Sequence, residues 1–278
     1  MGSEWSETTL GQLTKDGGGF IQTGPFGSQL HASDYVDEGI PVIMPVNMVD
    51  NRVSLNDIAR ITEADAQRLS KHLVQEGDIV YSRRGDVTRK ALITSGEVGM
   101  FCGTGCLLVR PGNQVDPQFL KYHLSTPENQ EWIIRHAIGA TMPNLNTGIL
   151  GDIPLRIPSK KIQKKIAEIL GTFDNKISLN RQINTTLESV AQVLFKSWFV
   201  DFDPVIDNAL AAGNEIPDAL QKRAAARAAR REALRQQSNK TTEATDADSP
   251  EQALPDTGLS DQRLPTEIQQ LFPDRFVF

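Results

Sequence analysis

The hydrophobic pattern changes character near residue 158. Before this point the apolar runs are short and bounded by glycine or proline, and some alternate with polar residues, as in DIVYSR at residues 78–83. Short bounded runs of this kind predict β-strands. The expected strands are residues 40–45, 78–83, 91–94, 105–109 and 153–157.

Helical segments are predicted between some of these strands. Residues 62–72 begin with Thr62 in a capping position and carry Asp65 three residues later, close to a capping box. Residues 117–138 are typical of two helices that separate at Pro127, because proline favours the first helical position. The candidate caps of these two helices are Asp116 and Thr126.

Strands and helices do not alternate regularly in this part of the chain, which disfavours a doubly wound sheet. We predict that residues 1–158 form one α+β domain, built on a twisted and mostly antiparallel sheet.

A long helix is predicted for residues 159–199, which lack proline and contain Gly171 as their one glycine. Apolar residues recur there with a spacing of seven. One row holds Ile166, Phe173, Asn180, Leu187 and Leu194, and a neighbouring row holds Leu170, Ile177, Asn184, Ala191 and Trp198. The resulting apolar face would extend over roughly 60 Å at ~1.5 Å per residue. Such a face favours a second helix of similar length, although packing on its own domain is the alternative. Asn180 in this face costs stability and typically fixes the register of a pair.

The remainder, residues 205–278, is expected to be helical in part and otherwise flexible. Residues 217–237 are alanine-rich and predict a helix whose arginines form a solvated face, a nucleic-acid contact or a contact to an acidic partner. These arginines are Arg223, Arg227, Arg230 and Arg231. Residues 238–262 are polar and acidic and are typical of a linker. The last residues contain Leu271, Phe272 and Phe276, which suggest a short docking segment.

Composition narrows the class of protein. The 278 residues include 29 Lys and Arg against 35 Asp and Glu, for a formal charge of −6. This charge disfavours non-specific coating of DNA but permits a local cationic patch.

The apolar runs are far shorter than a membrane helix, and the N-terminus lacks the pattern of a secretion signal, so we expect a cytoplasmic protein. Cys102 and Cys106 are expected to be buried thiols, since four scattered histidines do not indicate a metal site.

The sequence lacks the common signatures of catalysis. It has no G-x-x-x-x-G-K-[ST] phosphate loop, no G-x-G-x-x-G after a strand and no G-x-S-x-G. A methyltransferase motif is also missing, because Asp203-Pro204-Val205 does not supply one. We therefore expect a chain without catalytic activity, metal or cofactor of its own.

Three polar, glycine-containing stretches at residues 24–48, 75–93 and 138–159 suggest contact with DNA. Asn and Gln can contact adenine and Arg can contact guanine, whereas Ser and Thr suit phosphates. The candidate contacts are Ser28, Gln29, His31, Asn47, Tyr81, Ser82, Arg83, Arg84, Arg89, Lys90, Thr141, Asn144 and Asn146. We favour Arg89 and Lys90 for phosphates. Arg83 and Arg84 could meet a base or an adjacent phosphate, or could simply be solvated.

The order of these motifs resembles that of the specificity subunits of type I restriction-modification systems. The stretches WSETTLGQL, GPFGSQL, GDIVYSR and GATMPNLN follow one another as in that family. IQKKIAEILGTFDNKISLNRQIN looks like the family's conserved helix, so the resemblance covers roughly residues 4–204.

The resemblance implies a role for each part. Residues 1–158 would be a target recognition domain that reads half of a bipartite sequence in double-stranded DNA. The helix within residues 159–204 would set the spacing of the two halves. The subunit itself would be non-catalytic. It would bind modification subunits, which use S-adenosylmethionine, and it would meet the restriction and translocase subunit only indirectly.

The chain departs from the family pattern by having one recognition domain and one long helix. It would be either a half-length subunit or a fragment. A half-length subunit would pair as a homodimer and read a symmetric, interrupted palindrome. The expected interface residues are Ile166, Phe173, Ile177, Asn180, Leu187, Leu194 and Trp198. The main alternative is a decoy that binds modification subunits without reading DNA.

Overall fold

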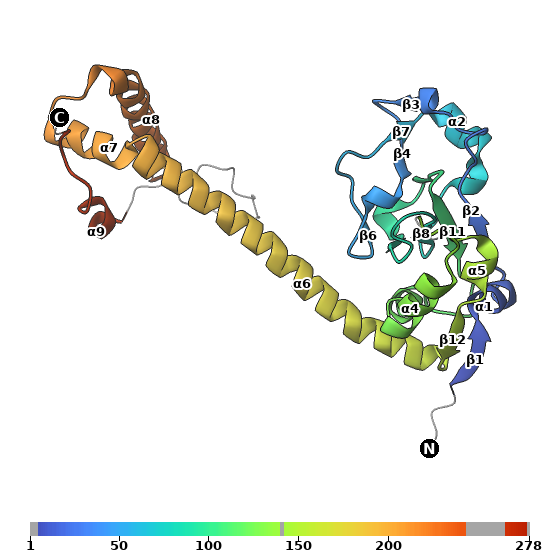
Figure 1. Cartoon of the computed structure of the whole chain (residues 1–278). Helices are drawn as coiled ribbons and strands as arrows, with labels where there is room; N and C mark the ends of the chain where they lie inside the picture. The colour runs from blue at the N-terminus through green and yellow to red at the C-terminus, as the bar shows by residue number, and fades with distance from the viewer. Residues whose placement is uncertain (1–4, 140–141, 243–264, 277–278) are drawn as a thin grey trace. The chain divides into compact units, whose positions relative to one another are not determined.

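The computed structural model describes residues 5–139, 142–242 and 265–276 (Figure 1). The chain divides into two compact units, Met1–Lys176 and Ile177–Phe278, and each is considered by itself. The first unit combines short strands with short helices, and the described part of the second is helical. One long helix, α6 (Lys160–Phe195), contributes residues to both. This is the predicted α+β class with a long helix.

The strands of the first unit form several small sheets. They are β1 (Ser6–Thr9), β2 (Phe20–Thr23), β3 (Tyr35–Val36), β4 (Ile40–Ile43), β5 (Met48–Val49), β6 (Arg52–Val53), β7 (Arg60–Ile61), β8 (Ile79–Ser82), β9 (Lys90–Leu92), β10 (Phe101–Cys102), β11 (Cys106–Arg110) and β12 (Pro154–Ile157). The two larger sheets have the orders β2-β11-β8-β9 and β10-β4-β7-β3, while β1 pairs with β12 and β5 with β6. Among the described strands only β10 and β4 are parallel, so the mostly antiparallel prediction is confirmed. The five predicted strands overlap β4, β8, β9, β11 and β12.

Short helices connect these strands. The α-helices are α1 (Leu10–Asp16), α2 (Glu63–Arg68), α3 (Pro117–His123), α4 (Pro127–His136) and α5 (Thr147–Gly151), and the 3-10 turns are η1 (Ala32–Asp34), η2 (Pro45–Asn47), η3 (Ser70–His72) and η4 (Ser95–Glu97). The predicted caps of α2 and α3 are confirmed. Thr62 Oγ1 accepts a hydrogen bond from Asp65 N at 3.1 Å, and the Asp116 carboxylate accepts one from Phe119 N at 2.9 Å. α4 begins at the expected proline without a side-chain cap bond from Thr126.

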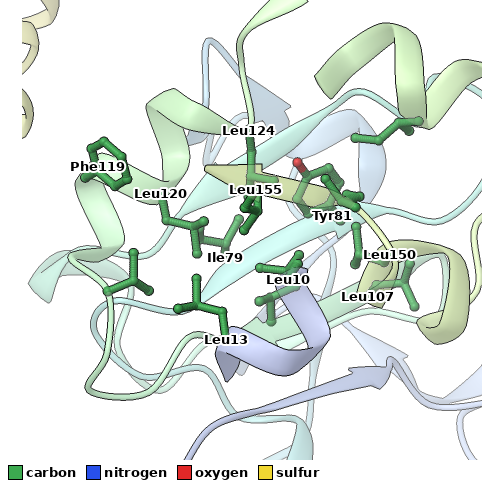
Figure 2. Packing of buried hydrophobic residues seen from close by; sticks show 14 of the residues in the cluster. Leu10, Leu13, Ile79, Tyr81, Leu107, Phe119, Leu120, Leu124, Leu150 and Leu155 are labelled. Carbon is green, nitrogen blue, oxygen red and sulfur yellow. The ribbon is translucent and has the colours of Figure 1, made fainter. Parts of the chain in front are cut away.

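The core surrounds β8 and β11, which are buried on both faces. Ile79 and Tyr81 point into a cluster with Leu10 of α1 (Figure 2). Val80 and Leu108 point into a second cluster on the opposite face. The alternation of apolar and polar residues around β8 therefore predicts a strand correctly. It would also suggest that one face is exposed, whereas both faces are buried.

The first turns of α6 are bonded to the first unit. Gln163 is 1% exposed, and its Oε1 accepts a hydrogen bond from Asp116 N at 2.8 Å. A second anchor lies further along the same helix. Asp174 accepts hydrogen bonds from Lys121 Nζ at 2.9 Å and from Tyr122 Oη at 2.8 Å. Partial burial acts to raise the pKa of Asp174, but these two donors outweigh it and hold the pKa below its ordinary value.

The second unit is held together by arginine–aspartate pairs. α6 continues into a π-helical turn, η5 (Lys196–Val200), which is followed by α7 (Asp203–Ala212) and α8 (Asp218–Thr242). Arg223 of α8 donates to both carboxylate oxygens of Asp203, at 2.7 and 2.9 Å, and Arg227 does the same to Asp207, at 3.0 and 2.7 Å. These two arginines have acidic partners within their own chain, which replaces the solvated-face and nucleic-acid alternatives for them.

The last described segment docks on α7. It contains α9 (Thr266–Gln269), and Asn208 Nδ2 donates to the carbonyl oxygens of Gln269 and Phe272 at 3.1 and 2.9 Å. The Phe272 ring lies 5.6 Å from that of Trp198. The predicted docking holds for Phe272, whereas Leu271 is 80% exposed. Of the predicted linker, residues 238–242 continue α8 and residues 243–262 lie outside the described residues. No helix in the described ranges could cross a membrane.

Buried His72 should make the stability of the first unit depend on pH. Its side chain packs against Phe101, and neither ring nitrogen has a hydrogen-bond partner within the described structure. Burial, with a smaller effect from Lys71, lowers the pKa of His72 from its ordinary 6.5 to about 4. Between these values the unfolded chain binds a proton that the folded chain does not, so stability falls as the pH is lowered through this window.

We expect His72→Leu to lose less thermal stability than the wild type when the pH falls from 7.5 to 5.0. Scanning calorimetry at both pH values measures this difference, and His31→Gln, at an exposed histidine, is the matched control. Parallel pH dependences of wild type and His72→Leu would contradict the assignment.

Candidate nucleic-acid interface

Two of the three predicted loops meet at the end of β8. Leu145 N donates a hydrogen bond to Arg83 O at 2.8 Å, and Gly85 N donates to Pro143 O at 3.1 Å. These backbone bonds join residues that are some sixty positions apart in the sequence. They bring the loop that holds Arg83 and Arg84 beside the loop that holds Asn144, which forms a β-bridge with Arg84.

The remaining predicted stretch contributes a loop at residues 24–30, which contacts the same cluster through Phe26. The Arg83 guanidinium carbon lies 5.9 Å from the centre of the Phe26 ring, a cation–π contact. Gly24 anchors the loop, because its N–H donates to Cys106 O at 2.9 Å. A side chain on Gly24 would place its Cβ 2.0 Å from Gly103 O, so only glycine fits the approach.

The exposed cations of this cluster are Arg84 and Arg89. Gly85, with φ of +75°, forms the predicted turn between them, and the Asp86 carboxylate accepts a hydrogen bond from Thr88 Oγ1 at 2.7 Å. Arg89 Nε lies 3.1 Å from the same carboxylate, with both side chains about half exposed. A pair this exposed contributes little to stability, and Arg89 can exchange it for another anion.

Four predicted contacts lie in the interior, and we withdraw them as DNA contacts. Tyr81 and Ser82 are fully buried, and Asn47 and Lys90 are each 2% exposed. Their roles are internal. Ser82 Oγ donates to Arg84 O at 2.9 Å and so supports the loop, while Asn47 Oδ1 accepts from Met44 N at 3.1 Å. Burial, reinforced by nearby Lys121, lowers the pKa of Lys90 to about 8, and burial raises the pKa of Tyr81.

The remaining candidates lie on the three loops. Ser28, His31 and Asn146 are exposed, and Gln29 is half-buried. Two of them also shape the backbone: Gln29 Oε1 accepts from Phe26 N at 3.1 Å, and Asn146 Oδ1 caps α5 by accepting from Ile149 N at 2.8 Å. Thr141 lies outside the described residues.

Phe26 is the residue of this cluster that the sequence reasoning missed. Its ring is 55% exposed although it is a large apolar group. The available signal was its position between Pro25 and Gly27, since an aromatic residue beside glycine in a polar stretch is often at a loop tip. Two further apolar side chains, Ile138 and Met142, are also exposed in the third loop, at 62% and 61%.

The arrangement suits recognition of a polyanion that presents hydrogen-bonding edges. Arginine and asparagine side chains can contact base edges, and exposed arginines and backbone amides can contact phosphates. Arg83 Nε and Asn144 Oδ1 are buried and have no hydrogen-bond partner in the described structure, so the site holds polar groups that its own chain leaves unsatisfied. No group of three or more metal-ligating side chains occurs among the described residues.

A polar, cationic loop cluster on a domain of small sheets, in a chain that continues into a long helix, suits a DNA-recognition module. The sequence model described as the type I restriction modification DNA specificity domain matches residues 3–189. The chain therefore belongs to this family, as the order of its motifs predicted.

Individual relatives agree with this assignment. The chain is 30% identical over 207 residues to the HindI specificity subunit of Haemophilus influenzae, covering 73% of this chain and 42% of that one. It is 26% identical over 230 residues to the MjaIX specificity subunit of Methanocaldococcus jannaschii, covering 79% and 52% respectively. The chain thus spans about half the length of these relatives. A chain from a structural study of complex assembly and conformational transition in a type I R-M system shares the fold, with a TM-score of 0.50, 16% identity and coverage of 68% and 43%.

The backbone at Gly24 lies very close to the carbonyl oxygen of Gly103, so adding one methyl group there should destabilise the protein. We expect Gly24→Ala to destabilise the protein by ~1–3 kcal/mol, because the new Cβ overlaps a backbone oxygen that cannot move cheaply. Urea denaturation measures the change. Gly27→Ala is the matched control in the same loop, since a Cβ there meets nothing within 4 Å. Equal stability of the two variants would show that the loop is not anchored as described.

Proposed function

We propose that this chain is the DNA sequence-recognition subunit of a type I restriction-modification complex. The observation that carries the proposal is the convergence of three distant loops on Arg83, which joins Phe26 on one side and the Asn144 loop on the other. Family membership supplies the reaction system in which such a cluster would act.

Within the cluster we assign two kinds of contact. Arg84 and Arg89 are exposed and suit phosphates, which position the protein on the duplex. Arg83 and Asn144 are half-buried, on two loops that are joined by backbone hydrogen bonds, and suit base edges. Ser28, His31 and Asn146 line the surrounding loops and are further candidates.

The rest of the chain supports this reading role. We assign residues 1–158 to target recognition, residues 159–204 to a spacer and dimerisation helix, and residues 205–278 to a helical C-terminal segment. The chain itself is non-catalytic in this proposal. Modification subunits dock on it and bring the methyltransferase chemistry with S-adenosylmethionine, and the restriction and translocase subunit joins through them. Such a complex works on chromosomal DNA, which places it in the cytoplasm.

The exposed face of α6 supports pairing with a second copy. Phe173 and Leu187 are each 59% exposed and Ile177 is 50% exposed, although all three are large apolar residues. Leu194 and Trp198 are half-buried, and Ile166 packs partly against the core of the first unit. A row of exposed apolar residues is costly in water and favours a helix partner. Two copies would read one bipartite target with the same loops.

Substitutions at the deeper contacts should weaken specific binding without unfolding the protein. We expect Asn144→Ala to reduce the affinity of the complex assembled with its modification subunits for its target by about 10- to 100-fold, because one bidentate base contact is worth ~1–3 kcal/mol. Arg83→Glu should reduce it further by placing an anion against DNA.

Fluorescence anisotropy with target and scrambled duplexes measures these changes. Arg135→Ala, which removes an exposed arginine on α4 outside the three stretches, is the control. Unchanged binding by folded Asn144→Ala and Arg83→Glu proteins would refute the contact assignment. A wild-type complex that binds no duplex specifically would instead favour a decoy.

The methylated sequence in cells should be symmetric. In cells that carry this chain and its modification subunits, we expect long-read methylation sequencing to find an interrupted motif whose halves are inverted copies. The two halves match because one chain would supply both readers. Methylation of an asymmetric bipartite motif would show that a different reader supplies the second half.

A further inference from the structure

The loop at residues 24–30 holds the Phe26 ring in a fixed but exposed position. At one end of the loop Gly24 is hydrogen-bonded to the first residue of β11, and at the other end Leu30, which is 3% exposed, packs into the core. Between these ends the backbone turns tightly. Gln29 N donates a hydrogen bond to Phe26 O at 2.8 Å, and Gln29 Oε1 accepts one from Phe26 N at 3.1 Å. The loop is therefore ordered by its own bonds, and it still leaves the ring uncovered.

This exposure is unfavourable in water, and the chain offsets little of it. Phe26 is 55% exposed, and the Arg83 guanidinium contacts the ring from a distance of 5.9 Å. One exposed apolar side chain is ordinary on a protein surface. Here, however, two more lie on the neighbouring loop, where Ile138 and Met142 are 62% and 61% exposed. Several exposed apolar side chains on adjoining loops indicate a surface that a ligand covers.

The second pair of apolar side chains is tied to the polar part of the candidate site. Ile138 and Asn144 exchange two backbone hydrogen bonds, at 3.0 and 2.9 Å, and Asn144 also forms the bridge to Arg84. The apolar and polar side chains therefore belong to one set of joined loops. A ligand that contacts the polar groups would also meet the apolar ones.

The chemistry of this surface identifies the part of the ligand that the ring contacts. Arg84 and Arg89 are exposed cations and suit an anionic ligand. Phe26 has no hydrogen-bonding group in its side chain, so it can bond neither a phosphate nor the edge of a base. A flat apolar ring can instead cover the face of a base. In a DNA duplex that face is accessible where two neighbouring base pairs separate.

We propose that Phe26 inserts between two neighbouring base pairs of the DNA target and partly unstacks them. Phenylalanine, isoleucine and methionine are among the side chains that serve as such wedges. The Arg83 guanidinium, which lies beside the ring, would then contact the bases or a phosphate of the same step. This inference deepens the proposed function and rests on it, because it adds a second means of selecting sequence to the hydrogen-bonded one.

Insertion would make the protein select a base step through its stiffness. Pyrimidine–purine steps such as TA and CA unstack more easily than other steps, so a protein that opens a step favours them without bonding their edges. We therefore expect a step of this kind where Phe26 enters each half of the target. Both kinds of step contain an adenine on at least one strand, which makes them accessible to an adenine analogue.

Base-analogue fluorescence tests the insertion in the complex of the full chain with its modification subunits. The target duplex carries 2-aminopurine, whose fluorescence rises when it is unstacked, in place of one adenine at a time. We expect the wild-type complex to raise the fluorescence at one step in each half. Phe26→Ala should remove this rise and weaken binding by about 10- to 100-fold. Phe26→Leu, which keeps an apolar wedge, should retain part of both.

Three controls separate insertion from other effects. A methyltransferase extrudes the base that it modifies, so the fluorescence rise at the methylated adenine should persist in the Phe26→Ala complex. A duplex with a mismatch at the selected step is already opened there, and it should restore most of the binding that Phe26→Ala loses. Ile134→Ala, which removes an exposed apolar side chain from α4, should change neither the fluorescence nor the affinity.

Other roles for Phe26 give other results, and each would overturn the insertion. An unchanged fluorescence profile in a Phe26→Ala complex that binds its target would show that the ring enters no base step. A loss of affinity that the mismatch does not restore would indicate a contact to the outside of a base, such as a thymine methyl group. Weaker assembly with the modification subunits in the absence of DNA would assign the ring to a protein contact.

The proposed function and the insertion can be told apart in these data. A wild-type complex that binds its target specifically without a Phe26-dependent rise would remove the insertion and leave the proposed function. A wild-type complex that binds no duplex specifically would remove both.

Discussion

The buried side-chain amide of Gln163 fixes the connection between β12 and α6, and the rest of this structure depends on that connection. It is bonded to the cap residue of α3 and, through its Nε2, to the carbonyl of Pro158 at 2.9 Å, at the point where the last strand gives way to α6. Asp174 repeats the attachment further along the helix through Lys121 and Tyr122. Both anchors lie within the first compact unit, so the first turns of α6 belong to the same unit as the three loops.

The loops themselves depend on a strand that is covered on both faces. β8 ends at Ser82, whose hydroxyl supports the backbone of Arg84, and it packs Tyr81 into the core. The side chains that face DNA in our proposal begin one residue later. Buried residues thus fix the backbone of the candidate site, and the residues that follow supply the groups that would contact DNA. This division explains why a short stretch such as SRRGD holds both the buried hydroxyl of Ser82 and the exposed guanidinium of Arg84.

The sequence revealed the local features of the structure and missed those that depend on distant partners. Caps such as Thr62 and Asp116, and the strands of the central sheet, follow from patterns within a few residues. The burial of Lys90 does not, because an alternating pattern cannot say whether a second layer covers the other face. The sequence left three alternatives for the arginines of α8, a solvated face, a nucleic-acid contact or an acidic partner. It could not choose among them, because the aspartate partners of Arg223 and Arg227 lie twenty residues earlier on another helix. The backbone hydrogen bond between Arg83 and Leu145 likewise joins residues that are far apart in the sequence, so no local pattern predicts it.

In the proposed homodimer, a polar residue in the pairing face of α6 would fix the spacing of the two recognition domains along DNA. A shift of α6 by seven residues would move one reading domain by ~10 Å along its partner, since each helical residue adds ~1.5 Å. That distance equals about three base pairs at ~3.4 Å each, and it would turn the second half of the target by roughly 100° around the duplex at ~10.5 base pairs per turn. A reader displaced in this way would meet the wrong face of the double helix. One amide in the middle of an apolar helix would therefore determine how many unread bases separate the two halves of the target.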